Sequence, residues 1–230
     1  MRIGVLGTGN MADALATHWV RAGHDVAVGG RDMHKAERLA TRLGGSAKPV
    51  SLHAAAEFGQ VVLSALPFGA GTSVVRELRA VMDGKVLIDC CNPVGPGFRL
   101  LTQSGLSAAQ QLAAAAPGTH VVKAFNLCHE DVWRMSPPIF DGRRLAVPVC
   151  GDDETALALV HELVRHVGCE PVAGGSLERA GLLEATAALF IGLWIGEGAD
   201  VQAIAPPLAY AAGPRDGEPQ TTEKAFRQEF

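Results

Sequence analysis

The first 28 residues read as strand, turn, helix and strand, and this pattern restricts the possible folds more than any other feature. An apolar strand at 2–6 leads into the turn Gly7-Thr8-Gly9-Asn10-Met11-Ala12, which has the spacing G-x-G-x-x-A. In such a turn Gly7 allows a sharp exit from the strand, Gly9 admits a pyrophosphate close to the backbone, and Ala12 lets the helix pack closely. The N–H groups at the start of the helix then point at the phosphates. The pattern predicts a dinucleotide site; the alternative is a glycine turn that holds no ligand.

The rest of the chain continues the alternation of strands and helices. Apolar, β-branched runs occur at 2–6, 25–28, 61–66, 85–89, 120–125, 144–149 and 169–172. Helical patterns occupy about 10–22, 33–43, 70–82, 105–115 and 152–168. Strands that are apolar throughout and separated by helices indicate a parallel sheet covered on both faces. We therefore expect an α/β fold, a Rossmann-type doubly wound and mainly parallel sheet, over residues 1–175.

A helical extension is expected at the C-terminus, over 176–230. It begins with an apolar helix from about 176 to 197, and the segment 213–224, "GPRDGEPQTTEK", has the composition of a linker. The apolar run 181–196 contains Glu184 and is shorter than a membrane span, so it is interpreted as a buried helix. Because its apolar residues occupy nearly every face, a second chain is expected to cover it in a homodimer. The alternative is a monomer in which the tail from 198 folds back over the helix.

Composition narrows the functional class. The chain has 230 residues, 48% hydrophobic and 19% charged, as is typical of a globular enzyme. The net charge of −4 argues against nucleic acid or an anionic membrane as a partner. Five cysteines without a C-x-x-C motif suggest neither a metal site nor a disulfide framework. Reduced, buried thiols in a cytoplasmic protein are the expectation.

The end of the second strand predicts which dinucleotide is bound. NAD-binding folds place an acid there for the ribose hydroxyl, whereas this chain has Gly29, Gly30 and Arg31. The glycines would leave room for a 2′-phosphate, and Arg31, with Lys35 one helical turn further on, would bind it. Asp32 either caps the next helix and turns away from the ligand or is a displaced NAD-type acid. The pattern favours NADP(H) over NAD(H), the alternative being that both cations are plain surface charges.

The carboxyl ends of the later strands carry the other candidate residues, because ligands of open α/β sheets bind there. Loops with Leu66 and Pro67, with Asn92 and Pro93, and with Asn126 are expected to surround the nicotinamide. Asn92 has an alternative role as a loop residue bonded to its own backbone. Lys123 is either a cation at the pocket or a lysine at a strand edge.

The ordered set "GVLGTGNMA", "GGRD-x-x-K-A", "IDCCNPV", "VVKAFN" and "GDDETA…HELVRHVGCEPV" resembles the F420-dependent NADP oxidoreductases and the related reductase domains of the STEAP proteins. The resemblance runs from Met1 to about Trp194. It implies a Rossmann domain with a short helical extension, often dimeric, that binds NADP(H). By the resemblance, the pyrophosphate lies on Thr8, Gly9, Asn10 and Met11, the 2′-phosphate on Gly30, Arg31 and Lys35, and the nicotinamide near Leu66, Pro67, Asn92, Pro93 and Ala124.

The sequence departs from the family at two places. Asp32 stands where a second arginine is common, and "LCHEDVW" follows Asn126, in a loop that helps form the family's acceptor pocket. The resemblance implies hydride transfer between NADP(H) and a deazaflavin (F420) or a flavin such as FMN or FAD. The alternatives are reduction of a small imine or carbonyl compound and a non-catalytic NADP(H) sensor. No catalytic residue is identified; if a proton must be supplied, the candidates are His129, Lys123 and Cys128, in that order.

Overall fold

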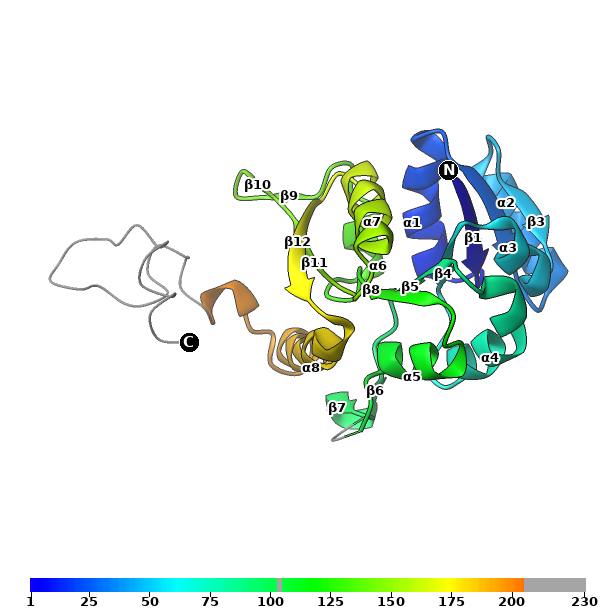
Figure 1. Cartoon of the computed structure of the whole chain (residues 1–230). Helices are drawn as coiled ribbons and strands as arrows, with labels where there is room; N and C mark the ends of the chain where they lie inside the picture. The colour runs from blue at the N-terminus through cyan, green and yellow to red at the C-terminus, as the bar shows by residue number, and fades with distance from the viewer. Residues whose placement is uncertain (103–104, 205–230) are drawn as a thin grey trace, which may run out of the picture. The chain divides into compact units, whose positions relative to one another are not determined.

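The computed structural model describes residues 1–102 and 105–204, and its main feature is an eight-stranded sheet (Figure 1). Its strands, in spatial order, are β3 (Lys48–Val50), β2 (Asp25–Gly29), β1 (Arg2–Leu6), β4 (Val61–Ser64), β5 (Val86–Asp89), β8 (His120–Lys123), β11 (Ala146–Cys150) and β12 (Glu170–Gly175). The order reverses between β1 and β4, which makes this the topological switch point of the sheet.

The strands from β3 to β8 are all parallel, and Ile3 of β1 lies between Val26 of β2 and Val61 of β4. The strand β11 runs antiparallel to β8, and β12 runs parallel to β11. The expected Rossmann-type, doubly wound and mainly parallel sheet is therefore confirmed. The antiparallel direction of β11 could not be inferred from its apolar residues, because strand direction is set by the connection that precedes it.

Helices cover both faces of the sheet. The helices are α1 (Asn10–Arg21), α2 (Met33–Leu43), α3 (Leu52–Phe58), α4 (Ala70–Met82), α5 (Ala108–Ala115), α6 (Glu130–Trp133), α7 (Glu154–His166) and α8 (Ala180–Ile191). Figure 1 shows α1 and α7 on one side of the strands and α4 and α5 on the other. Each side has its own hydrophobic core: Ile3 and Trp19 belong to the core under α1 and α7, and Leu6 and Leu112 to the core under α4 and α5.

Polar side chains begin several of these helices. Asp32 caps α2, Ser51 caps α3 and Asp153 caps α7, each by accepting a hydrogen bond from a backbone N–H in the first turn. Ser107 and Gln110 form a capping box at the start of α5. The local sequence therefore determines where these helices start.

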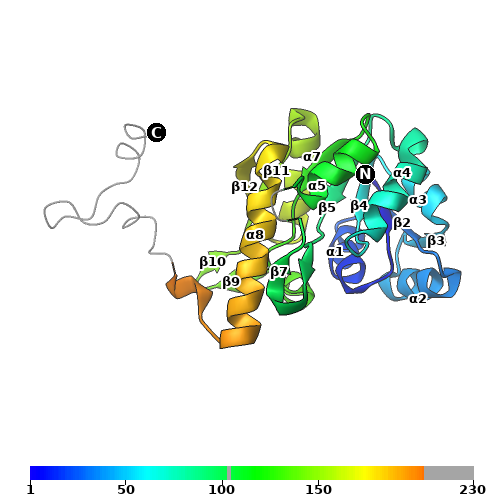
Figure 2. The same ribbon diagram turned by 90° about the horizontal axis from the view of Figure 1, so that it is seen from below.

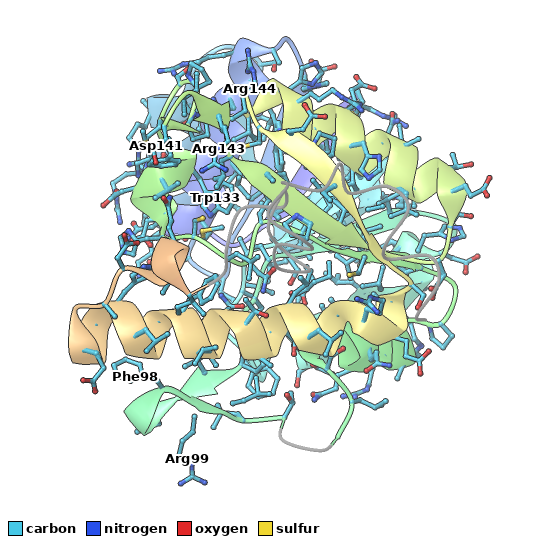
Figure 3. The ribbon with its side chains drawn as sticks, turned by 90° about the vertical axis from the view of Figure 1, so that its left-hand side faces the viewer. Phe98, Arg99, Trp133, Asp141, Arg143 and Arg144 are labelled. Atoms are coloured by element: carbon cyan, nitrogen blue, oxygen red, sulfur yellow. The ribbon has the colours of Figure 1, made fainter. Side chains whose placement is uncertain are left out.

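Several short elements were not expected from the sequence. They are β3 with α3, the helical turn α6, and the hairpins β6–β7 (Val94–Gly95 and Arg99–Leu100) and β9–β10 (Ile139–Phe140 and Arg143–Arg144). The second hairpin carries Asp141, Arg143 and Arg144 on the side of the molecule that also shows Trp133 (Figure 3). Elements this short have too few residues for a hydrophobic period to be visible in the sequence.

The helix α8 continues beyond Ile191 as a π-helical segment, Gly192–Glu197, so that one continuous helix is formed (Figure 2). Together with the turn before α8, the helical stretch Leu177–Glu197 has 21 residues. Within the described residues it is the one helix long and apolar enough to cross a membrane by length and composition. The run 181–196, which was expected to be shorter than a span, is part of this longer helix. The criterion is weak evidence for a membrane, since buried helices of other proteins also meet it.

The C-terminal part divides inside this helix rather than before it. A first compact unit ends at Ala188, and a second begins at Leu189. Glu184, Ala187 and Ala188 are buried, whereas Leu182, Leu189 and Ile195 are 56%, 55% and 72% exposed. Within the described residues the helix is therefore only partly covered. The segments 213–224 and 205–230 lie outside the described residues, so the tail-over-helix alternative stays open.

Candidate functional site

The two glycines in the turn after β1 have different surroundings. Gly7 has φ +122°, and a Cβ on it would lie 2.4 Å from the carbonyl oxygen of Ala65. Its N–H donates to Gly29 O at 2.9 Å, so this residue is fixed by the fold. Gly9 has ordinary extended backbone, and a Cβ on it would meet no atom within 4 Å. Nothing in the protein's own packing demands a glycine at position 9, which is what a cradle for a ligand requires.

The N-terminus of α1 is open to an anion. Gly9 is the N-cap residue, and because it has no side chain it does not accept hydrogen bonds from the N–H groups of the first turn. Backbone N–H groups at such a helix end, together with the helix dipole, bind phosphate groups. The geometry therefore agrees with the predicted pyrophosphate position at Thr8, Gly9, Asn10 and Met11.

An acid in the first turn of α1 is neutralised by two arginines. Asp13 accepts a hydrogen bond from Arg42 Nε at 2.9 Å and another from Arg134. Burial alone would raise the pKa of Asp13, but these hydrogen bonds lower it below its ordinary value. The carboxylate stays ionised and carries its own counter-charges. It therefore does not cancel the positive end of α1.

The segment after β8 lies against the same turn. Asn10 Nδ2 donates to Glu130 Oε1 at 2.8 Å, and Arg134 of the same segment reaches Asp13. Burial raises the pKa of Glu130, but hydrogen bonds from its own backbone N–H and from Asn10, together with the nearby charges of His129 and Arg134, lower it below its ordinary value. The loop "LCHEDVW", for which the family resemblance implies an acceptor-pocket role, is in contact with the phosphate turn.

At the end of β2 the structure gives Gly29 a packing role. A Cβ on Gly29 would lie 2.8 Å from Ala55 Cβ and 3.0 Å from Ser51 O, so α3 and not a phosphate fills the space beside it. A Cβ on Gly30 would meet Thr8 Cγ2 at 2.9 Å. The idea that both glycines leave room for a phosphate is therefore wrong for Gly29, because a helix absent from the sequence prediction packs there.

Three charged residues follow β2. Arg31 and Lys35 are exposed, and neither side chain has an ion pair within the described residues. Asp32 accepts from Lys35 N at 3.3 Å as the N-cap of α2. Of the two roles considered for Asp32, the helix cap is observed. Its carboxylate is directed at the backbone of its own helix.

The loops after β4 and β5 face one small hollow. The residues that line it are Ser64, Leu66, Pro67, Phe68, Gly69, Gly71, Thr72, Asp89, Cys91, Ala108 and Leu112. Leu66 is half-buried and Pro67 exposed, which leaves their surfaces accessible at the strand ends. The structure thus places two of the predicted nicotinamide residues next to the end of β5.

Two asparagines join the loops after β5 and β8. Asn92 Nδ2 donates to Asn126 O at 2.6 Å, and Asn126 Nδ2 donates to Asn92 Oδ1 at 2.9 Å and to Leu183 O at 3.0 Å. The alternative role of Asn92, a bond to its own backbone, is not what is observed. The pair holds the predicted nicotinamide residues Asn92 and Pro93 beside Ala124, with Pro93 and Ala124 buried.

Lys123 lies in a buried ion network. Its Nζ donates to Asp89 Oδ2 at 2.8 Å, to Glu184 Oε1 at 3.0 Å and to the Cys91 carbonyl, and all three charged side chains are fully buried. Burial lowers the pKa of Lys123, but the two carboxylates raise it above its ordinary value. A lysine at a strand edge is not observed, because β8 lies between β5 and β11. Lys123 is buried, and two of its partners, Asp89 and Cys91, line the hollow described above. Lys123 joins β8 to β5 and to α8.

The carboxylate of Glu184 reaches a further partner. It accepts hydrogen bonds from the backbone N–H groups of Ala108 at 2.9 Å and Ala109 at 3.3 Å, at the start of α5. A negative charge is stabilised at this end of a helix. Two carboxylates and one ammonium ion would leave a net negative charge in the core, and α5 offsets it. This network fixes the first half of α8 on the sheet.

The other two candidate proton donors lie in the segment after β8. His129 caps α6, accepting from Asp131 N at 3.3 Å, and its side chain is 66% exposed. Burial raises the pKa of Cys128 to about 11, so its thiol stays protonated near neutral pH. All five cysteines are free thiols.

Comparison with known proteins identifies the family. The family described as NADP oxidoreductase, coenzyme F420-dependent, matches residues 2–93. The F420-dependent NADP reductase of Methanothermobacter marburgensis is 30% identical over 210 residues, covering 84% of this chain and 92% of the relative. The chain belongs to the F420-dependent NADP reductase family. It is accordingly an NADP-dependent oxidoreductase.

The chain is also similar to a metalloreductase and to a solved bacterial structure. Metalloreductase STEAP3 of Rattus norvegicus is 32% identical over 193 residues, 84% of this chain, and the chain spans 38% of that relative's length. A solved structure from Arthrobacter sp. FB24, named as a proposed F420-dependent NADP reductase, has a TM-score of 0.75. It is 23% identical and covers 85% of this chain and 94% of that one, which shows a shared fold.

Sequence reasoning missed three residues of the site region. Asp89 and Glu184 form the ion network with Lys123, and Glu130 holds Asn10 of the phosphate turn. A signal for Glu184 was present, because it is the only charged residue in the apolar run 181–196. Charged residues in such runs are rarely buried without a partner. Nothing local to Asp89 or Glu130 indicated their partners.

Proposed function

We propose that this NADP-dependent oxidoreductase transfers a hydride between NADP(H) and a deazaflavin of the F420 type. The observation that carries the proposal is the pairing of polar side chains at the ends of β5 and β8. Lys123, Asn92 and Asn126 are each hydrogen-bonded to other groups of the protein. Within the described residues, this region offers no acid poised to protonate a substrate. A deazaflavin ring can delocalise the added charge itself and does not need such an acid.

The nucleotide half of the proposal rests on the open turn. The backbone N–H groups of α1 bind the pyrophosphate beside Gly9, where the protein leaves space for a ligand. Arg31 presents a planar guanidinium and Lys35 a point charge toward solvent at the end of β2, and they bind the 2′-phosphate. NADPH supplies the hydride when bound.

The nicotinamide half is a matter of positioning. The Asn92–Asn126 pair fixes the loops after β5 and β8 relative to each other, and the proposal places the nicotinamide ring beside Leu66 and Pro67, at the edge of the hollow that these residues line. Holding two rings at reacting distance lowers the barrier without chemical participation by a side chain. The proposal assigns Leu66, Pro67 and Asn92 to the walls of this position. Pro93 and Ala124, which the resemblance also implies, are buried in the structure.

Steady-state NADPH oxidation tests the acceptor. We expect turnover with F420 and much slower turnover with FMN, FAD or a panel of cyclic imines and small ketones. Turnover of an imine instead would transfer the protein to the alternative class, and oxidation of NADPH by none of the acceptors, with NADPH binding intact, would favour a sensor. Gly9→Val serves as the control that any observed turnover requires the phosphate turn.

We also propose a cytoplasmic homodimer. The exposed apolar side chains of α8 and its continuation, such as Leu182, Leu189 and Ile195, would be covered by a second copy. Fully burying a side chain of this size is worth about 1.5–3 kcal/mol relative to exposure. Light scattering at micromolar concentration should give twice the chain mass. A monomer would refute the dimer, and a monomer that associates once the chain is cut near Gly198 would identify the tail as the cover.

A further inference from the structure

We propose that His24, Glu162 and His166 form a binding site for a divalent transition metal of the zinc class. His24 lies in the turn between α1 and β2, and Glu162 and His166 lie one helical turn apart in α7. Their ligand atoms all lie within 4.8 Å of one another, and His24 Nε2 is 2.9 Å from His166 Nδ1. Two imidazoles and a carboxylate are a common ligand set for zinc, with the fourth position left to water.

The spacing of the three side chains suits such an ion. Bonds of about 2.0–2.1 Å in a tetrahedron place neighbouring ligand atoms about 3.3–3.4 Å apart. The two imidazole nitrogens are a few tenths of an ångström closer than this. Glu162 and His166 are exposed and stand on the surface of α7, so both can adjust to an ion that arrives from solvent.

His24, by contrast, is held in place. Its backbone N–H donates to Trp19 O at 3.0 Å, and its carbonyl accepts from Ser46 Oγ at 2.7 Å. The indole of Trp19 in turn donates to Leu163 O at 3.2 Å, which fixes α1 against α7. His24 is 4% exposed and faces the helix that carries the other two ligands. One ligand is therefore held by the fold and the other two are exposed side chains, an arrangement that can bind an ion without rebuilding the backbone.

A further group faces the ring of His24 from the side away from His166. The Met1 nitrogen lies 2.9 Å from His24 Nδ1. When Nε2 binds a metal, Nδ1 carries the ring proton, so the Met1 nitrogen must accept from it or move aside.

The site is separate from the nucleotide site. His24 directly precedes β2, whereas Gly29 ends β2 and Arg31 follows it. The two sites therefore lie at opposite ends of this strand. A metal here would join the first strand–helix–strand unit to α7 and would raise stability by binding only the folded chain. It should leave NADPH affinity unchanged.

Zinc titration of the full-length, chelator-treated protein tests the proposal. We expect one zinc ion per chain by calorimetry and by metal analysis, together with a rise in melting temperature of a few degrees at saturating zinc. His166→Ala and Glu162→Gln should each weaken binding at least about tenfold, and cobalt(II) should show no thiolate charge-transfer absorption. Both altered residues are exposed, so neither variant should fail to fold.

His34→Ala is the matched control. His34 Nδ1 lies 3.3 Å from Glu37 Oε2 on an exposed helix face, so the pair has the same chemistry without a third ligand. Zinc affinity should not change in this variant. Absence of zinc binding at micromolar concentrations, or equal binding by the parent protein and His166→Ala, would overturn the proposal and leave a hydrogen-bonded histidine pair.

Discussion

The two halves of the strand-end region differ in how their polar groups are partnered. On the β1–β2 side, Gly9 faces empty space and Arg31 and Lys35 point to solvent. On the β5–β8 side, Lys123 and the asparagine pair are bonded within the protein. A charged ligand can gain new hydrogen bonds only where the protein has not already used its donors. Under the proposed function, the β1–β2 side would therefore provide the affinity for the nucleotide, and the β5–β8 side would provide a fixed shape.

The largest effect on stability should come from breaking the ion network on the β5–β8 side. In Lys123→Met the carboxylates of Asp89 and Glu184 remain buried without their cation. Removing one partner of a buried ion pair costs about 3–5 kcal/mol, so the variant should unfold at much lower urea concentration. Adding Glu184→Gln should recover part of this loss. Unchanged stability of the single variant would show that Lys123 is not buried as the structure has it.

The next largest effect, on NADPH binding, should come from placing a side chain at Gly9 on the β1–β2 side. Gly9→Val should weaken NADPH binding at least about 100-fold, or about 2.7 kcal/mol, because the side chain occupies the pyrophosphate position. Circular dichroism and melting temperature should stay close to those of the parent, since the new side chain meets no protein atom within 4 Å in its Cβ position.

Gly7→Ala is the paired comparison for that variant. Its Cβ would lie 2.4 Å from Ala65 O in a backbone conformation that suits glycine, so this change should lower the melting temperature. If Gly9→Val retained NADPH affinity, the turn would not be the phosphate site. If Gly7→Ala were as stable as the parent, the packing distinction between the two glycines would be lost.

A smaller effect separates NADPH from NADH. Measured affinity should favour NADPH at least about tenfold, or about 1.4 kcal/mol, and Arg31→Ala should remove most of this preference with NADH affinity nearly unchanged. Fluorescence titration with both nucleotides measures it. Equal affinity of the parent protein for the two nucleotides would contradict the assignment of Arg31 and Lys35.

The smallest effect concerns Asp32. Loss of this N-cap in Asp32→Ala should cost about 1 kcal/mol of stability while the ratio of NADPH to NADH affinity stays the same. Asp32→Asn, which still caps, should be close to the parent in stability. A clear loss of NADH affinity in both variants would instead identify Asp32 as an acid that contacts the ribose.

The sequence predicted the parts of this protein that depend on neighbouring residues. The glycine-rich turn, the alternation of the main strands and helices along the chain and the cap of α2 follow from patterns a few residues long. The elements it missed, β3 with α3 and the two hairpins, are short, and α3 in turn explains Gly29. The family resemblance added the NADP-dependent reductase class, which the comparisons confirmed. The residues assigned to the nicotinamide and the 2′-phosphate remain predictions.

Only the tertiary structure decided which polar side chains are bonded to other groups of the protein. Lys123 meets Asp89 and Glu184, which are 34 and 61 positions away, and His24 meets His166 at a separation of 142. These contacts depend on the order of strands in the sheet and on where α7 and α8 dock against it. Hydrophobic periodicity records which face of an element is buried, but not which distant element covers that face. A lysine in a strand therefore looks the same in the sequence whether it binds a ligand or fills the core with two carboxylates.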